Sequence, residues 1–196
     1  MNKSRITHRR LAHKDDRDFY PTPTWATEAL LDMETFSGRI LEPACGDGAI
    51  SCILGKQYTV WSSDLWDHGY GLSGEDFLLR TKKADNIVTN PPYHLAEAFV
   101  HQGLKLTRNK LCLLLRLAFL EGGGRAKRIY KVGLAPSRVW VFSERITFYR
   151  KGAERKGSGT NAYAWFVWDK AYKGPTLLKW IPLGFKPTSK SASRIL

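Results

Sequence analysis

The sequence predicts an α/β fold in which one doubly wound, mostly parallel β-sheet carries helices on both faces. One observation behind this prediction is that short β-rich runs alternate with helix-compatible stretches along most of the chain. Another is that a Gly-rich turn, an aspartate and an Asn-Pro-Pro-Tyr tetrapeptide each stand directly after an expected strand. Ligand sites in such sheets lie beyond the carboxyl ends of the strands, so these three features should converge on one edge.

The expected elements follow from the spacing of apolar residues and from the residues that interrupt it. The first helix, 24–33, comes after Pro21 and Pro23 and has apolar residues at helical spacing. The others, in order, are a strand at 40–41, a helix ending near 53, strands at 58–63 and 86–89, a helix at about 95–106, a buried strand at 111–115, a basic helix at 125–132, and two last strands at 138–142 and 163–168. Four tryptophans near the last strands are expected in the core: Trp140, Trp165, Trp168 and Trp180.

The length and composition favour one compact globular domain. The chain has 196 residues, of which 43% are hydrophobic and 25% are charged. We expect a basic, flexible arm over 1–18, one domain over 19–185 and a flexible tail over 186–196. The three cysteines form no C-x-x-C pair, so neither a disulfide framework nor a zinc cluster is indicated, and Cys45 and Cys112 are expected as buried thiols.

The charge balance points to a polyanionic partner. Lys and Arg total 31 against 18 Asp and Glu, a net charge of +13. Such a surface binds phosphate backbones by counterion release, although solubility alone is the other explanation of the charge. The longest apolar run, 111–120, is interrupted by Arg116 and is too short to span a bilayer, and the charged N-terminus has no apolar signal region. A cytoplasmic protein without a membrane partner is therefore expected, and its oligomeric state is left open.

The Gly-rich turn Glu42–Gly48 follows an expected strand and opens an expected helix. Gly46 and Gly48 let the backbone turn sharply and approach a ligand closely, because no Cβ intrudes. The turn does not match the dinucleotide-binding pattern, since Ser51 stands where G-x-G-x-x-G requires its third glycine, and the chain has no G-x-x-x-x-G-K-[ST] loop. A structural turn would look the same, so the interpretation depends on the neighbouring motifs.

Two acidic positions support a nucleoside-binding interpretation of this turn. Asp64 ends the next strand, 18 positions after Gly46, where a carboxylate can accept hydrogen bonds from both ribose hydroxyls. A helix cap or turn residue is the alternative for Asp64. Asp76 and Phe77 could supply a carboxylate to an adenine amino group and a ring edge to its face.

The most specific motif is Asn90-Pro91-Pro92-Tyr93. The Asn90 side chain offers a neutral carbonyl acceptor, and Pro91 adds a backbone carbonyl. Two acceptors aimed at one NH2 group orient it and stabilise the positive charge that develops when its nitrogen attacks a methyl group. Pro92 lacks an N–H donor, and Tyr93 provides a face for stacking a planar group. A strand-terminating turn is the alternative explanation.

In this order the motifs resemble the amino-group S-adenosylmethionine-dependent methyltransferases with an NPPY motif, most closely the small phage and prophage N6-adenine DNA methyltransferases. The resemblance extends from about Phe19 to Leu183. It implies a Rossmann-like class I methyltransferase fold with an antiparallel last strand, S-adenosylmethionine as cofactor and an extruded adenine of DNA as substrate. The implied cofactor contacts are Tyr20, Thr22, Glu42, Ala44, Gly46, Asp64, Leu65, Asp76, Phe77 and Asn90.

The resemblance also implies a catalytic and a substrate-binding set. Residues 90–93 match the catalytic tetrapeptide without substitution. Family members often place an aromatic residue of a late loop, here 143–161, against the extruded base, and Phe148 is the candidate, with Tyr149 as the alternate. The basic residues of this loop could follow a phosphate backbone: Arg145, Arg150, Lys151, Arg155 and Lys156. The helix cluster Arg125, Lys127, Arg128 and Lys131 could extend that surface or form a solvated face.

One departure and three rival functions remain. Large family members carry a separate target-recognition domain, for which this chain has no room, so little or short sequence specificity is implied. RNA adenine methylation and protein glutamine methylation keep the same chemistry with another acceptor. A catalytically silent nucleic-acid-binding protein is the third alternative. The net charge favours nucleic acid over protein but does not separate DNA from RNA.

Overall fold

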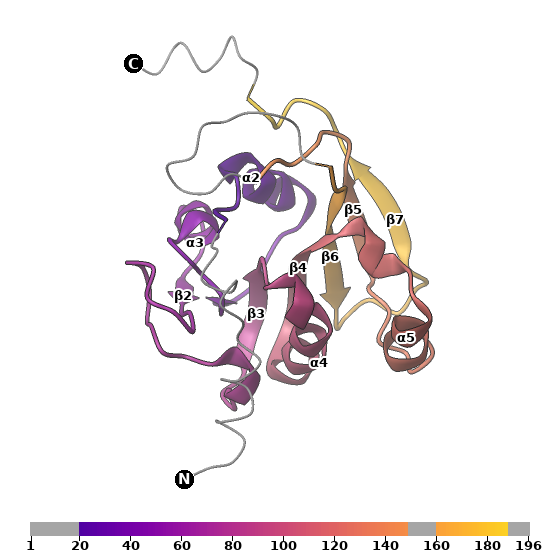
Figure 1. Cartoon of the computed structure of the whole chain (residues 1–196), viewed down its shortest axis with the longest axis horizontal. Helices are drawn as coiled ribbons and strands as arrows, with labels where there is room; N and C mark the ends of the chain where they lie inside the picture. The colour runs from indigo at the N-terminus through magenta and orange to yellow at the C-terminus, as the bar shows by residue number, and fades with distance from the viewer. Residues whose placement is uncertain (1–19, 149–159, 188–196) are drawn as a thin grey trace.

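The computed structural model describes residues 20–148 and 160–187 (Figure 1). The expected arm at 1–18 and the part of the expected tail beyond residue 187 lie outside the described residues. The helices are α2 (Thr24–Met33), α3 (Ala49–Leu54), η2 (Phe77–Leu79), η3 (Tyr93–Leu95), α4 (Ala96–Leu106), η4 (Leu117–Leu120), α5 (Gly123–Arg125) and η5 (Ala126–Tyr130). The strands are β1 (Ile40–Glu42), β2 (Val60–Ser62), β3 (Ala84–Thr89), β4 (Thr107–Arg116), β5 (Arg138–Phe142), β6 (Tyr163–Asp169) and β7 (Leu177–Ile181).

The seven strands form one sheet in the order β2-β1-β3-β4-β6-β5-β7. Strands β2, β1, β3 and β4 pair in parallel, as do β5 and β7. Strand β6 is antiparallel to both of its neighbours, β4 and β5. The carboxyl ends of β1, β3 and β4 therefore lie at the same edge of the sheet, which confirms the predicted doubly wound, mostly parallel architecture.

Two apolar cores separate the sheet from its helices. Strand β4 contributes to both cores. Residues Leu111 to Leu115 are all at most 1% exposed, and successive side chains of a strand point to opposite faces of the sheet. Cys112 and Leu114 join the core under α2 and α3, whereas Leu111, Leu113 and Leu115 join the core under α4 and η5. Figure 1 shows α2 and α3 together on one side of the sheet and α4 and α5 together on the other.

Most expected elements are present close to their predicted positions, and one strand was not predicted. The strand expected last, at 163–168, is β6, and it is antiparallel as expected. Strand β7 follows it at the edge of the sheet, paired in parallel with β5. An edge strand buries little of one face, so Leu178 and Trp180 of β7 remain exposed and the run lacks the apolar signature of its neighbours.

The tryptophan and cysteine expectations have different outcomes. Trp140, Trp165 and Trp168 are buried, as predicted, but Trp180 is 64% exposed, so its assignment to the core was wrong. The reason is that Trp180 lies on the uncovered face of β7. Cys45 and Cys112 are buried free thiols. Among the described helices, none is long and apolar enough to cross a membrane.

Candidate active site

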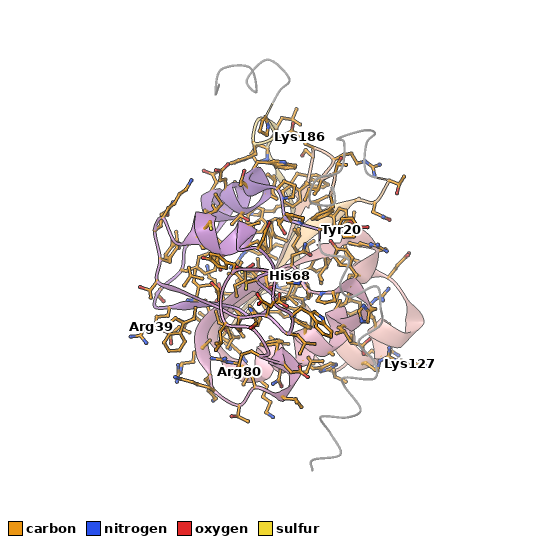
Figure 2. The ribbon with its side chains drawn as sticks, turned by 60° about the vertical axis from the view of Figure 1, so that its left-hand side comes forward. Tyr20, Arg39, His68, Arg80, Lys127 and Lys186 are labelled. Atoms are coloured by element: carbon orange, nitrogen blue, oxygen red, sulfur yellow. The ribbon has the colours of Figure 1, made fainter. Side chains whose placement is uncertain are left out.

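A cavity of about 730 Å³ opens at the carboxyl ends of β1, β3 and β4. Most of the residues predicted for the site line it. They are Tyr20, Thr22, Glu42, Ala44, Asp64, Leu65, Asp76, Phe77, Asn90, Pro91, Pro92, Tyr93 and Phe148. Figure 2 shows the cavity residues Tyr20 and His68 near the middle of the molecule, with Arg39 at the left edge of the molecule and Arg80 toward the bottom.

The Gly-rich turn needs both of its glycines. Gly46 and Gly48 have positive φ angles of 53° and 85°, a region that favours glycine. A Cβ added at Gly48 would lie 2.6 Å from the Tyr70 ring, so this position also lacks space for a side chain. The turn therefore has the sharp glycine-dependent backbone that the sequence predicted, while the cavity itself is lined by Glu42–Cys45 on one side of the glycines and by Ala49 and Ile50 on the other.

Asp64 connects the ends of β1 and β2. Its Oδ2 accepts a hydrogen bond from the Gly46 N–H at 2.8 Å, and its Oδ1 accepts one from the Trp66 N–H at 2.9 Å. Gly46 itself is not among the cavity-lining residues and acts here through Asp64. Each carboxylate oxygen has a second lone pair, so Asp64 can hold the turn and still accept hydrogen bonds from a ligand.

Glu42 is the most deeply buried acid of the cavity, with 1% of its surface exposed. The Ser51 hydroxyl donates a hydrogen bond to Glu42 Oε2, and Ser51 Oγ lies 2.5 Å from Ser62 Oγ. Burial raises the pKa of the Glu42 carboxyl well above its ordinary value, although the hydrogen bond from Ser51 lowers it in part. A cationic ligand group placed beside this carboxyl would favour its ionised form.

Asn90 stands directly after β3 and carries an unused acceptor. Its Nδ2 donates a hydrogen bond to Thr22 Oγ1 at 3.1 Å, and Thr22 is only 5% exposed. Its Oδ1 is buried and has no hydrogen-bond partner in the structure. Leaving a buried acceptor unpaired costs about 1–3 kcal/mol. Asn90 also lines the cavity, and a ligand amino group that reached Oδ1 would remove that cost by donating to it.

Tyr93 belongs to an aromatic cluster at one wall of the cavity. Its ring centroid lies 5.7 Å from that of Tyr163, which in turn lies 4.9 Å from that of Phe148. The Arg116 guanidinium carbon stands 4.9 Å from the Tyr93 ring centroid. Burial raises the pKa of Tyr93 further above its ordinary value, so its hydroxyl stays neutral and does not act as a base.

Asp76 and Phe77 have structural contacts as well as places in the cavity lining. Asp76 Oδ1 accepts a hydrogen bond from the Leu78 N–H at 2.9 Å and caps the short helix η2. Phe77 is 4% exposed and packs against Phe99 with ring centroids 4.8 Å apart. Phe77 therefore lines the cavity while most of its surface is buried in the core.

None of the described basic residues proposed for substrate binding lines the cavity: Arg145, Arg125, Lys127, Arg128 and Lys131. The Arg145 Nη1 instead donates a hydrogen bond to the backbone carbonyl of Thr160 at 2.8 Å. In the helix cluster, Arg125 bonds to backbone carbonyls and Arg128 pairs with Glu97. The remaining loop residues lie outside the described residues: Tyr149, Arg150, Lys151, Arg155 and Lys156.

Sequence reasoning did not select Arg116, which lines the cavity at the end of β4. The sequence did contain a sign that Arg116 is unusual, because it is the one charged residue in the apolar run 111–120. In the part of the chain that the structure describes, no group of three or more His, Cys, Asp and Glu side chains could hold a metal ion.

No family model and no curated protein matches the sequence, but many solved structures share the fold. A protein from Vibrio vulnificus assigned as a modification subunit of a type I restriction enzyme has a TM-score of 0.61 at 15% identity, over 99% of this chain and 57% of its own. One from Listeria monocytogenes assigned as a class I S-adenosylmethionine-dependent methyltransferase has a TM-score of 0.55 at 16% identity, and the match covers 88% of this chain and 66% of that protein. One from Pyrococcus horikoshii assigned as an RNA methyltransferase has a TM-score of 0.53 at 13% identity, and the match covers 76% of this chain and 81% of that protein.

The chain spans less than two thirds of the length of the first two of these proteins. Their low identities establish a common fold rather than a common activity. Three observations point to the same fold: the sheet order, the antiparallel strand β6 among the central strands, and the likeness to these structures. This chain has the Rossmann-like α/β fold of the class I S-adenosylmethionine-dependent methyltransferases.

Proposed function

We propose that this protein transfers the methyl group of S-adenosylmethionine to the N6 amino group of adenine in DNA, with little or short sequence specificity. The observation that carries the proposal is the unpartnered, buried Oδ1 of Asn90 beside a cavity of this fold. An acceptor fixed in this way suits a substrate that brings N–H donors, which an adenine amino group does.

The Asn90 side chain and the Pro91 backbone carbonyl explain how a poor nucleophile would be made reactive. The lone pair of an aromatic amino group is delocalised into the ring. Hydrogen bonds to Asn90 Oδ1 and to the Pro91 carbonyl would orient the two N–H bonds and stabilise the positive charge that develops on nitrogen. Thr22 holds the Asn90 amide so that its oxygen remains the acceptor. No strong general base is needed, because the proton can leave after the methyl group has moved.

The opposite half of the cavity fits the proposed cofactor. S-adenosylmethionine supplies an electrophilic methyl group on a positively charged sulfur when it is bound. Asp64 would accept hydrogen bonds from its ribose hydroxyls, and Asp76 would accept one from its adenine amino group. Glu42 would face its positively charged methionine portion, and Tyr20, Thr22, Ala44 and Leu65 complete the proposed contacts.

The net charge of +13 favours nucleic acid over protein as the acceptor, and the neighbour assigned to a restriction enzyme supports DNA as the nucleic acid. Tyr93 and Phe148 supply the aromatic surface that a base outside its helix would need. The neighbour assigned as an RNA methyltransferase makes RNA the second candidate.

A direct comparison of acceptors tests the proposal. The full chain is incubated with S-adenosylmethionine labelled in its methyl group and, in separate reactions, with DNA, with RNA of the same sequence and with a glutamine-containing peptide. We expect label in DNA. Transfer to RNA or peptide in preference to DNA would show that DNA is not the substrate. The absence of both methyl transfer and cofactor binding would overturn the enzyme assignment.

The raised pKa of Glu42 leads to a pH-dependence prediction. Burial raises the pKa of the Glu42 carboxyl and a cationic cofactor beside it would lower that pKa again, so cofactor binding should release protons and affinity should rise with pH. Glu42→Gln mimics the neutral carboxyl, so this rise should disappear and binding should be weaker at high pH. Calorimetry with S-adenosylmethionine across the neutral range checks this.

The cofactor's own amino group also titrates, so the difference between wild type and Glu42→Gln is the quantity to compare. Identical pH profiles for the two proteins would show that Glu42 does not change its protonation on binding.

A further inference from the structure

The charges that line the cavity are divided between its two sides. All four acidic residues come from β1, the end of β2 and the segment that follows it: Glu42, Asp64, Glu75 and Asp76. Arg116, at the end of β4, is the one Arg or Lys among the described lining residues. The acidic side suits the cationic cofactor proposed above, whereas the Arg116 side suits an anion.

Arg116 is held in position but lacks an anionic partner. Its strand neighbour across the antiparallel pair is Tyr163, and its guanidinium stands over the ring of Tyr93. Of the described residues, no carboxylate lies within ion-pairing distance of Arg116. Contrast Arg138, which binds Glu34 and Asp169. An exposed guanidinium beside an aromatic ring keeps its hydrogen-bond donors available to a ligand.

The neighbours of Arg116 indicate what kind of anion would reach it. Tyr93 is separated from the two proposed acceptors of the amino group, Asn90 and Pro91, by Pro92 alone. Tyr163 and Phe148 continue the aromatic wall. A planar base placed here with its amino group on Asn90 would have its sugar and phosphate near the cavity mouth. A guanidinium matches the geometry of a phosphate oxygen pair.

We infer that Arg116 binds a phosphate group that flanks the target nucleotide, and so restricts the amino-group substrate to a base carried on a phosphodiester chain. This inference rests on the proposed function and deepens it. Arg116 acts as a specificity-determining contact outside the reacting atoms. The carboxylate of the cofactor is the rival anion, and stacking support for Tyr93 alone is the rival role.

The test combines an Arg116→Met variant with a neutral phosphate. Methionine keeps much of the apolar stem and removes the charge. The substrate is a single-stranded adenine-containing oligonucleotide, made either with normal phosphates or with an uncharged methylphosphonate on one side or the other of the target. For wild type, we expect one of the two replacements to lower kcat/KM about tenfold. On the normal strand, Arg116→Met should have a kcat/KM about tenfold below that of wild type. On the strand with the effective methylphosphonate replacement, the variant's kcat/KM should fall no further.

Two further readouts separate the rivals. The salt dependence of oligonucleotide binding should fall by about 0.7 in log–log slope in Arg116→Met, as expected for one lost phosphate contact on a single strand. Calorimetry should show unchanged binding of S-adenosylmethionine. The matched control is Arg39→Met, because Arg39 also stands over an aromatic ring, that of Trp61, and lies away from the cavity residues Tyr20 and His68 (Figure 2).

Each other outcome contradicts the inference. Weaker cofactor binding by Arg116→Met would assign Arg116 to the cofactor carboxylate. A lower kcat with the methylphosphonate effect intact would reduce Arg116 to a support for Tyr93. Equal losses in Arg39→Met would show a general charge effect. If wild type methylates no oligonucleotide at all, the proposed function fails, which is distinguishable from all of these results.

Discussion

Replacing Asn90 by Ala should lower methyl transfer by about 10²–10³-fold, the loss typical of removing one preorganised hydrogen-bond partner from a transition state. The reason is local. Asn90 Oδ1 is a buried acceptor with no partner in the protein, and its amide is oriented by Thr22. Alanine removes the acceptor from the amino group at the moment when positive charge develops there. Steady-state transfer of labelled methyl groups to DNA measures the loss.

Binding of the cofactor should change little in the same variant, because the cofactor contacts proposed for Asp64 and Asp76 lie with the acidic residues that follow β2, away from Asn90 at the end of β3. Asn109→Ala is the matched control, since Asn109 also donates through its side-chain amide but lies outside the cavity lining. Near-normal turnover by Asn90→Ala, in a protein that still binds S-adenosylmethionine, would contradict the proposed role of the tetrapeptide.

The largest stability effect is expected at Glu34, which is 4% exposed and lies at the start of the segment between α2 and β1. Arg138 donates to it through Nε at 2.5 Å and Nη2 at 2.9 Å, Lys110 donates through Nζ at 2.6 Å, and Trp140 donates through Nε1 at 2.9 Å. Glu34→Ala should therefore lower the free energy of unfolding by about 3–5 kcal/mol, because it leaves charged donors without their buried partner.

Urea unfolding followed by circular dichroism measures this loss, and Glu97→Ala is the control. The pair of Glu97 with Arg128 is also charged, but 61% of the Arg128 side chain and 27% of the Glu97 side chain are exposed to solvent. Screening by water makes such a pair weak, so its removal should cost much less. A loss in Glu34→Ala no larger than that in Glu97→Ala would contradict the assignment.

The pH dependence of stability has a definite sign at Glu34. Burial alone would raise the pKa of this carboxyl, but the hydrogen bonds from Arg138, Lys110 and Trp140 bring the pKa below its ordinary value. A lowered pKa gives stability that is present above the unfolded-state pKa and is lost as the pH falls through the folded-state pKa. The difference in unfolding free energy between wild type and Glu34→Ala should therefore shrink as the solution is acidified.

Much of the fold could be predicted because local patterns and tertiary structure agree. Strand β4 reads as a continuous apolar run since both of its faces are covered, and α2 has apolar residues at helical spacing because one face packs on the sheet. Strand β7 was missed because its pairing with β5 is what defines it. No property of residues 177–181 alone indicates that pairing, and the exposure of Trp180 follows from the same edge position.

The site was predictable where backbone chemistry restricts the residue type. Gly48 has a positive φ, and the Tyr70 ring stands where a Cβ would lie. Asn90 stands at a strand end before two prolines. The double role of Asp64, and the place of Arg116 over Tyr93, depend on contacts between residues far apart in the chain. Long-range contacts of this kind leave no local pattern, so only the folded structure brings them together.

The measurement that tests the central claim most directly is mass spectrometry of nucleosides from DNA methylated by the wild-type chain, because it identifies the atom that receives the methyl group. The buried acceptor of Asn90 suits an amino group, so we expect N6-methyladenine in wild type and its loss in Asn90→Ala. Methylation of a ring nitrogen or carbon in place of an amino nitrogen would contradict the account of Asn90-Pro91-Pro92-Tyr93.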